Sequence, residues 1–198
     1  MKDHILKHAP MVRDRFESYA REFLLEDCDL SWSTLAQKVG QTGIRIEFPV
    51  FELDLASASY LSPVRRSGPE EVSESQREFI DLSFRMALME AAAAESGGTL
   101  VIDAPESSLD AVFVRRAAEV LARFGNADEM NRLVVTSNLT DGDLVPRLLE
   151  RCGFDSREQR IVDLFEIAEP TAAVREHFDE YNAVRQRLWR HAEGGARE

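Results

Sequence analysis

The sequence contains few of the residues that build metal centres or covalent cross-links. It has two cysteines, Cys28 and Cys152, and four histidines. Two cysteines so far apart form neither a disulfide framework nor a zinc-ligand pattern, so we expect buried free thiols. The histidines stand singly in charged, helix-like surroundings and form no group of ligands. The composition therefore predicts neither a disulfide scaffold nor a structural metal.

Long apolar runs are also missing. No stretch approaches the ~20 apolar residues that a membrane span needs, and the charged residues 1–4 lead into no signal-peptide core. With 44% hydrophobic and 30% charged residues among 198, the composition is that of a soluble globular protein with one core. We therefore predict a cytoplasmic protein with no membrane partner.

An excess of positive charge is missing as well. The formal net charge is -12, the wrong sign for a protein whose whole surface holds phosphate backbones. Small basic groups occur at Arg65-Arg66, at Arg115-Arg116 and over residues 185–190. Such groups are usually solvated faces. Any contact with DNA is therefore expected to be local or to come from a partner.

Hydrophobic periodicity predicts two helices, an extended region and a loop in the first half of the chain. Apolar residues at three- and four-residue steps predict a helix over residues 3–26. Alternating residues over 44–55 predict strand structure, and residues 62–69, which combine Ser, Pro and Gly, predict a loop. A long helix is predicted over residues 73–95, opening with a capping box.

The second half of the chain shows a strand–helix–strand pattern. The two strands are predicted at residues 99–102 and 133–135, and the helix at 111–124. This order implies parallel strands joined by a right-handed crossover. Alternation over residues 160–167 predicts another strand, and residues 171–192 a terminal amphipathic helix. The predicted fold class is α/β, a parallel-strand sheet with flanking helices.

Two carboxylates lie close behind the first of these strands. Asp103 follows it directly, at the sheet edge where ligands of parallel sheets sit, and could hold Mg²⁺ through its water shell. The segment Ser107-Ser108-Leu109-Asp110 comes next, and Asp110 would also cap the following helix. An Asp after a strand is as often a turn or cap residue, so both interpretations stay open.

Polar residues mark two further positions. Ser73, Ser75 and Gln76 stand where the long helix opens, and its free backbone N–H groups can bind a phosphate there. The capping box of Ser73 and Gln76 is the structural alternative. Ser137 and Asn138 follow the strand at residues 133–135. Either could orient a water or a phosphate oxygen, but neither carries a proton as histidine does.

In their order and intervals these segments resemble the C-terminal lobe of an ABC-type ATPase head of the SMC-like and RecN/RecF-like kind. The strand ending in Asp103 is similar to a Walker B motif, residues 72–76 to the ABC signature and residues 107–110 to the D-loop. Ser137 or Asn138 stands at the position of the switch histidine. The resemblance covers roughly residues 44–167.

The resemblance also extends to domain organisation and partners. Residues 1–30 resemble the end of a coiled-coil arm, which leaves residues 31–198 as the head lobe. The nucleotide site would bind ATP with Mg²⁺ and would be shared between the two heads of a head–head dimer. The implied function is ATP-gated head engagement in DNA repair, chromosome maintenance or defence against foreign DNA, with DNA contacted through the assembled complex.

The resemblance assigns roles to individual residues. Asp103 would bind Mg²⁺ within its own head, and Asp110 would couple the two sites. Ser73, Ser75 and Gln76 would contact ATP held by the opposite head.

The sequence departs from the family pattern at the catalytic carboxylate. Ala104 occupies the usual glutamate position, and Glu106, two residues on, is the candidate to polarise the attacking water. The signature glycines are replaced by Glu74 and Ser75.

The larger departure is the missing phosphate loop. No Gly-x-x-x-x-Gly-Lys-Ser/Thr occurs, and residues 40–43 have neither its spacing nor its lysine. We therefore expect ATP hydrolysis only when a Walker A-bearing N-terminal lobe, on the same or a neighbouring polypeptide, completes the head.

Two other interpretations stay open. A non-hydrolysing interaction or dimerisation module that keeps the ATPase-head fold would explain Ala104, the missing switch histidine and the missing phosphate loop. The chain could also be a fragment or a truncated reading frame of a longer protein, without activity of its own.

Overall fold

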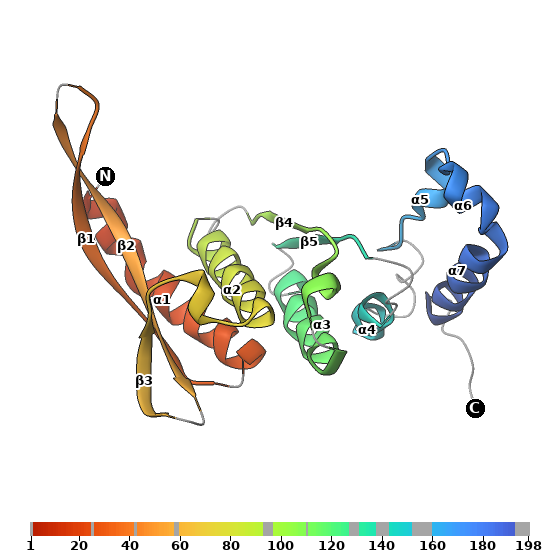
Figure 1. The fold of residues 1–198 in the computed structure, drawn as a ribbon, viewed down its shortest axis with the longest axis horizontal. Coiled ribbons are helices and arrows are strands. Elements are labelled where there is room, and N and C mark those ends of the chain that lie inside the picture. Colours follow the sequence, from red (N-terminus) through yellow and green to blue (C-terminus); the bar gives the residue numbers. More distant parts are fainter. Residues whose placement is uncertain are drawn as a thin grey trace. The chain divides into compact units, whose positions relative to one another are not determined.

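The computed structural model describes residues 2–24, 26–41, 43–57, 60–92, 97–109, 111–126, 131–137, 143–151 and 160–192. These residues form two compact units. The first comprises the chain as far as Leu100 with a short segment ending at Arg132, and the second comprises the remainder from Val101 onward. The fold is mixed α/β, as predicted, with one antiparallel and one parallel sheet (Figure 1). None of the helices within the described ranges combines the length and hydropathy needed to cross a bilayer.

The first unit contains a long antiparallel hairpin. Its strands β1 (Cys28–Val39) and β2 (Ile44–Ser57) pair from Cys28 with Leu55 to Val39 with Ile44. Gly40 and Gly43 at the turn have φ values of 74° and 66°, which glycine adopts without steric cost. The strand structure predicted over residues 44–55 is confirmed. The partner strand β1 was not predicted.

The predicted loop over residues 62–69 is wrong, because most of it forms the strand β3 (Tyr60–Arg66). The strand order is β1-β2-β3, so β3 lies at an edge, where proline is tolerated. Pro63 also falls where the register with β2 shifts, between Leu55 and Ser57. Arg65 joins the two strands, with its guanidinium 3.0 Å from Asp54 and 2.6 Å from Glu52. A 3-10 turn, η1 (Pro69–Glu71), follows.

Two helices complete the first unit. They are α1 (Lys2–Leu24) and α2 (Glu74–Ala92), close to the predicted bounds. Aromatic rings join them: Phe23 stacks on Phe79 with centroids 4.8 Å apart. Each ring buried in this way contributes roughly 1.5–3 kcal/mol. The helix α1 therefore belongs to the core of this unit, and its continuation into a coiled-coil arm stays a prediction.

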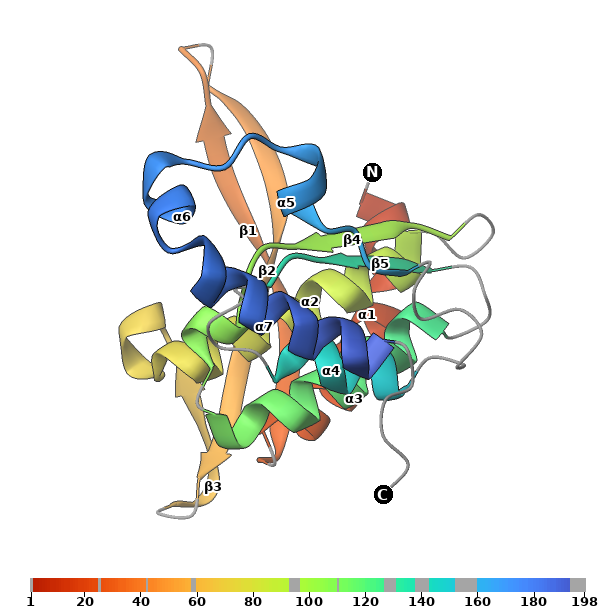
Figure 2. The same cartoon turned by 90° about the vertical axis from the view of Figure 1, so that its right-hand side faces the viewer.

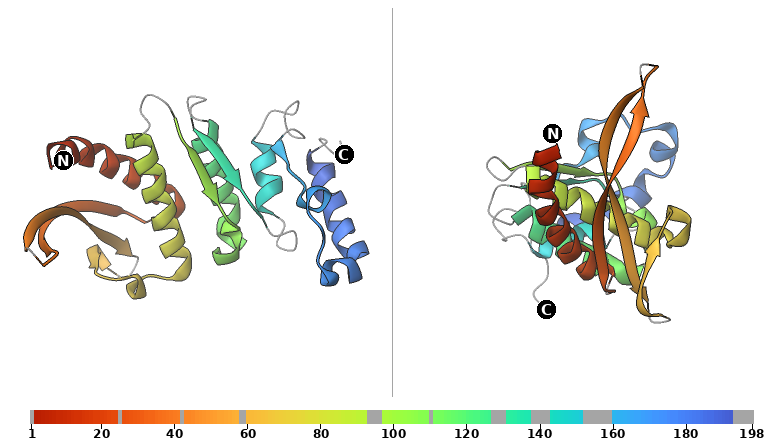
Figure 3. Two further views of the ribbon diagram at one scale, coloured as in Figure 1. Left: turned by 90° about the horizontal axis from the view of Figure 1, so that it is seen from above. Right: turned by 90° about the vertical axis from the view of Figure 1, so that its left-hand side faces the viewer.

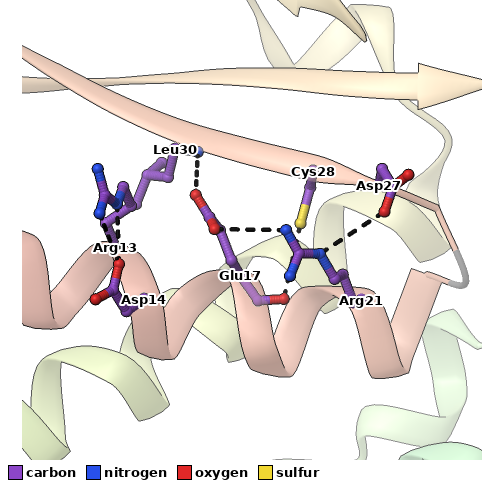
Figure 4. Close-up of polar contacts among 7 residues, drawn as sticks. All are labelled: Arg13, Asp14, Glu17, Arg21, Asp27, Cys28 and Leu30. Carbon is purple, nitrogen blue, oxygen red and sulfur yellow. Dashed lines mark hydrogen bonds and ion pairs between the residues drawn. The ribbon is translucent and has the colours of Figure 1, made fainter.

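Polar contacts fasten α1 to β1 (Figure 4). The Glu17 carboxylate accepts the Leu30 backbone N–H at 3.3 Å and lies 3.6 Å from Arg21, which in turn lies 3.8 Å from Asp27. Burial raises the pKa of Glu17, and it raises the pKa of the Cys28 thiol to about 11. Cys28 is a buried free thiol, as predicted, while Cys152 lies outside the described residues.

The strand–helix–strand prediction is confirmed. The strands β4 (Thr99–Ile102) and β5 (Arg132–Val135) flank the helix α3 (Ala111–Asn126) in the sequence. Their pairing is parallel, since the N–H of Arg132 donates to Gly98 at 2.8 Å and the N–H of Thr136 to Ile102 at 3.0 Å. The helix covers one face of this pair (Figure 3). There Val114 and Ala118 of α3 pack with Val135 and with Leu144 of α4 (Leu144–Glu150).

The strand predicted over residues 160–167 is wrong. The chain forms the single-turn helix α5 (Leu164–Ile167) there. Asp163 caps it by accepting the Phe165 N–H at 2.9 Å, and Arg185 binds the same carboxylate at 2.7 Å. The first bond satisfies a backbone N–H at the start of the helix, and the second neutralises the capping carboxylate. Both favour a turn over an extended strand.

The terminal helix predicted over residues 171–192 is present but divided. The helix α6 (Ala172–Glu176) is capped by Thr171, and the helix α7 (Phe178–Ala192) follows it (Figure 2). At His177 the backbone leaves helical geometry, with φ -108° and ψ 26°. The periodicity that predicted one helix is the same in both pieces, so it could not reveal the break.

Candidate nucleotide site

The ends of the two parallel strands meet through side chains. Thr136, directly after β5, donates a short hydrogen bond from its hydroxyl to the Asp103 carboxylate, directly after β4. The Thr136 hydroxyl oxygen also accepts the backbone N–H of Ala104 at 3.0 Å. Thr136 was not among the predicted site residues. Its position after the second strand was the signal, because the carboxyl ends of parallel strands share one sheet edge.

Ala104 adopts an uncommon backbone conformation. Its φ of 42° and ψ of 55° lie in the left-handed region, which costs an L-residue roughly 1–2 kcal/mol. The conformation is held from both sides: the Ala104 N–H donates to the Thr136 carbonyl at 3.2 Å, and the Ala104 carbonyl accepts the Ser107 hydroxyl at 2.8 Å. The turn leads into the 3-10 segment η2 (Pro105–Ser108), which carries Glu106.

Glu106 is one of the few buried charged residues, with 6% of its surface exposed. Its carboxylate accepts a hydrogen bond from the Ser137 hydroxyl at 2.7 Å. The structure therefore brings together two predicted site residues that lie 31 positions apart in the chain. Asp103, in contrast, is exposed. Of the two carboxylates, Asp103 is the one accessible to a ligand from solvent.

Asp103 is suited to a metal ion that is coordinated mostly by water and phosphate oxygens. Within the residues that the structure describes, no group of three or more His, Cys, Asp and Glu side chains is placed to hold a metal ion. Mg²⁺ on a nucleotide typically takes one or two protein carboxylates and completes its shell with water and phosphate oxygens. Asp103, oriented by Thr136, fits that limited role.

The predicted trans site has the geometry of a helix cap. The Ser73 N–H donates to Gln76 Oε1 at 3.0 Å, and the Gln76 N–H donates to Ser73 Oγ at 3.2 Å, so the capping box is confirmed. The Gln76 amide also donates to Glu26 at 3.2 Å. Ser73, Ser75 and Gln76 belong to the first unit, and Asp103, Glu106 and Ser137 to the second.

The remaining two predicted site residues, Asp110 and Asn138, lie outside the described residues. Their assignment to the D-loop and to the switch position stays a prediction.

No protein-family model matches the chain, and no curated protein matches it.

Proposed function

We propose that the chain is the C-terminal half of an SMC-like ABC ATPase head, acting in ATP-gated head engagement on DNA. The observation that carries the proposal is the hydrogen bond between Thr136 and Asp103 at the carboxyl ends of parallel β4 and β5. Open parallel sheets bind ligands at this edge. An exposed carboxylate held there by the neighbouring strand is suited to receive a nucleotide-bound Mg²⁺.

The exposed valines on one face of the β4–β5 pair favour a further lobe that would pack on that face. Val101 and Val134 point away from α3 and are 62% and 49% exposed. Parallel strands normally read as continuous apolar runs because both of their faces are covered. A sheet of two strands is also marginal by itself. A further lobe that added strands and covered these valines would complete the sheet.

The proposal assigns a role to each of the predicted site residues that the structure describes at the two strand ends and at the start of α2. Asp103 would hold Mg²⁺, and Thr136 fixes the orientation of its carboxylate. Glu106, hydrogen-bonded by Ser137, is the candidate to orient the attacking water. Ser73, with the first turn of α2, faces the phosphates held by an opposite head. Bound Mg²⁺ would supply neutralisation of the phosphate charge.

The missing phosphate loop makes the proposal testable on the chain alone. A helix N-terminus contributes roughly 0.3–2 kcal/mol towards an anion, far below the ~8 kcal/mol of micromolar affinity. We expect calorimetry of the purified chain with Mg²⁺-ATP to show no micromolar binding. Micromolar binding by the chain alone would contradict the half-site proposal.

The second arm of the test uses the completed head. When the chain is co-purified with a Walker A-bearing lobe, we expect Mg²⁺-dependent nucleotide binding that Asp103→Asn abolishes. Asp81→Asn, on the exposed side of α2 and paired with Arg85, is the matched control and should leave binding unchanged. If Asp103→Asn preserves the Mg²⁺ dependence, Asp103 is only a turn residue.

A non-hydrolysing interaction module is the second candidate. The burial of Glu106 and its bond to Ser137 favour it, because a general base must reach a water on the substrate. ATP binding and turnover measured on the completed head distinguish the ATPase from the interaction module. Nucleotide binding without turnover would support the interaction module.

A further inference from the structure

The end of the β1–β2 hairpin exposes an apolar face. Leu35 pairs with Phe48 and Val39 with Ile44, and these four side chains are between 38% and 61% exposed. At the base of the hairpin the buried residues of β1 are Cys28 and Leu30. Because successive residues of a strand face opposite sides, Leu35 and Val39 lie on the other face, away from the core. We call the segment from residue 33 to residue 50 the hairpin tip; it extends beyond α1 (Figure 1).

The hairpin tip is basic in a strongly acidic chain. It contains Lys38, Arg45 and one acidic residue, Glu47, whereas the whole chain has a net charge of -12. Lys38 and Arg45 stand directly opposite each other across the two strands, an arrangement in which like charges destabilise a hairpin. Among the described residues, no ion pair involves either of them. An acidic surface that binds the tip would relieve this repulsion.

A second exposed apolar surface lies around α5 in the second unit. Its members are between 45% and 72% exposed: Val162, Leu164, Ile167 and Phe178. The ring of Phe165 lies 5.6 Å from that of Tyr181, which holds α5 against α7. Phe178 stands one helical turn before Tyr181, on the same side of α7. We call these four side chains, together with the acidic residues of the same segment, the acidic patch; α5 and α7 are labelled in Figure 2.

Acidic residues are frequent in the segment that forms the acidic patch. Residues 161–180 contain six acidic residues and one arginine, Arg175. One of the six, Asp163, is largely shielded in its ion pair with Arg185. The other five are exposed to solvent: Glu166, Glu169, Glu176, Asp179 and Glu180. The patch therefore combines exposed apolar side chains with five exposed carboxylates, which we call its rim, and its charge is opposite to that of the hairpin tip.

We propose that the hairpin tip of one copy of this chain docks on the acidic patch of a second copy. The apolar faces would bury each other, and Lys38 and Arg45 would lie beside the carboxylates of the rim. At the tip the ribbon is two strands wide, because β3 pairs with β2 only from Leu53 onward. The long basic side chains on the back of the ribbon can therefore reach around its edges. This contact goes beyond the proposed function and needs no nucleotide.

The size of the two surfaces predicts a weak contact. Exposed apolar patches of monomers reach about 300–600 Å², whereas a stable interface buries about 800 Å² on each partner. We therefore expect reversible self-association, with a dissociation constant on the order of micromolar or weaker. Because opposite charges contribute to it, the association should weaken as the salt concentration rises beyond about 0.15 M.

Charge reversal tests the pairing of the two surfaces. Sedimentation velocity of the full chain, over rising concentration, is expected to show self-association. Lys38→Glu with Arg45→Glu should weaken it at least tenfold, and so should Glu166→Lys with Glu169→Lys. Mixing the two variants should restore association, because each then offers the surface that the other lacks. Glu70→Lys with Asp143→Lys is the control, since it changes the net charge as much as the patch variant does.

The apolar contribution is tested separately. Leu35→Ser with Ile44→Ser should also weaken association at least tenfold, while circular dichroism and the melting temperature stay close to those of the parent chain, because both side chains are exposed. A chain that remains monomeric up to several hundred micromolar would overturn the proposal. The proposal would also be overturned if the mixture of the two charge variants did not associate. A third contrary result would be that Lys38→Glu with Arg45→Glu leaves self-association unchanged and weakens only the binding of DNA.

Discussion

The hydroxyl of Thr136 hydrogen-bonds the carboxylate of Asp103, although 33 positions separate them in the chain. The bond links the ends of the two parallel strands and, with the N–H of Ala104, closes the turn that follows β4. The exposed carboxylate therefore has a fixed orientation before any ligand arrives. Such preorganisation is what a metal-binding carboxylate needs from its surroundings.

We predict that Thr136→Val destabilises the second unit by about 1–2 kcal/mol, because the turn loses two hydrogen bonds, one of them to a charged group. Thr136→Ser keeps the hydroxyl and should cost less than half as much. Urea unfolding followed by the emission of Trp189, in a Trp32→Phe background, measures both. A loss of stability in Thr136→Ser with none in Thr136→Val would show that the methyl group of Thr136 matters and its hydroxyl does not.

Ala104→Gly should stabilise the chain by up to about 1 kcal/mol, because glycine adopts the left-handed conformation without the steric cost that alanine incurs. Ala118→Gly, in the buried part of α3, is the matched control and should destabilise by about 1 kcal/mol. The same unfolding assay compares them. Destabilisation by Ala104→Gly would show that the turn at residue 104 carries no strain.

Glu106→Gln should lower ATP turnover of the completed head by ~10²–10⁴-fold and leave nucleotide affinity unchanged, as expected for loss of a general base. Glutamine retains an oxygen that can accept the Ser137 hydroxyl, so the local structure should persist. Single-turnover kinetics and equilibrium binding separate the two effects. Equal turnover in parent and variant would place the chemistry on another residue.

The ion pair of Asp163 and Arg185 should make the stability of the α5–α7 contact depend on pH. Burial alone would raise the pKa of Asp163, but hydrogen bonds from Arg185, the Phe165 N–H and Trp189 outweigh it and hold the pKa below its ordinary value. Because the folded-state pKa is depressed, the stabilisation is fully present above about pH 4 and is lost as the pH falls through the lower folded value.

Asp163→Asn therefore should destabilise the chain by about 1–3 kcal/mol at pH 7, with a difference from the parent that shrinks below pH 4. Urea unfolding at pH 7, 4 and 2.5 checks this. Asp179→Asn, on the exposed first turn of α7, is the control. A difference that stays constant across this range would exclude titration of Asp163 as its source.

Local patterns in the sequence determined the elements that depend on near neighbours. The capping box of Ser73 and Gln76 set the start of α2, and the apolar runs at residues 99–102 and 133–135 became the parallel strands. Each of these signals lies within a few residues of its effect. Capping bonds and hydrophobic periodicity act over that range, so the sequence alone was sufficient for them.

Contacts between distant residues decided the rest. Residues 62–66 form a strand because they pair with β2, across which Arg65 also binds Asp54. Residues 164–167 form a helix whose capping carboxylate is held by Arg185. The bond from Thr136 to Asp103 also joins two residues that are far apart in the sequence. In each case the deciding partner lies 11 or more positions away, and only the folded chain brings it within hydrogen-bond distance.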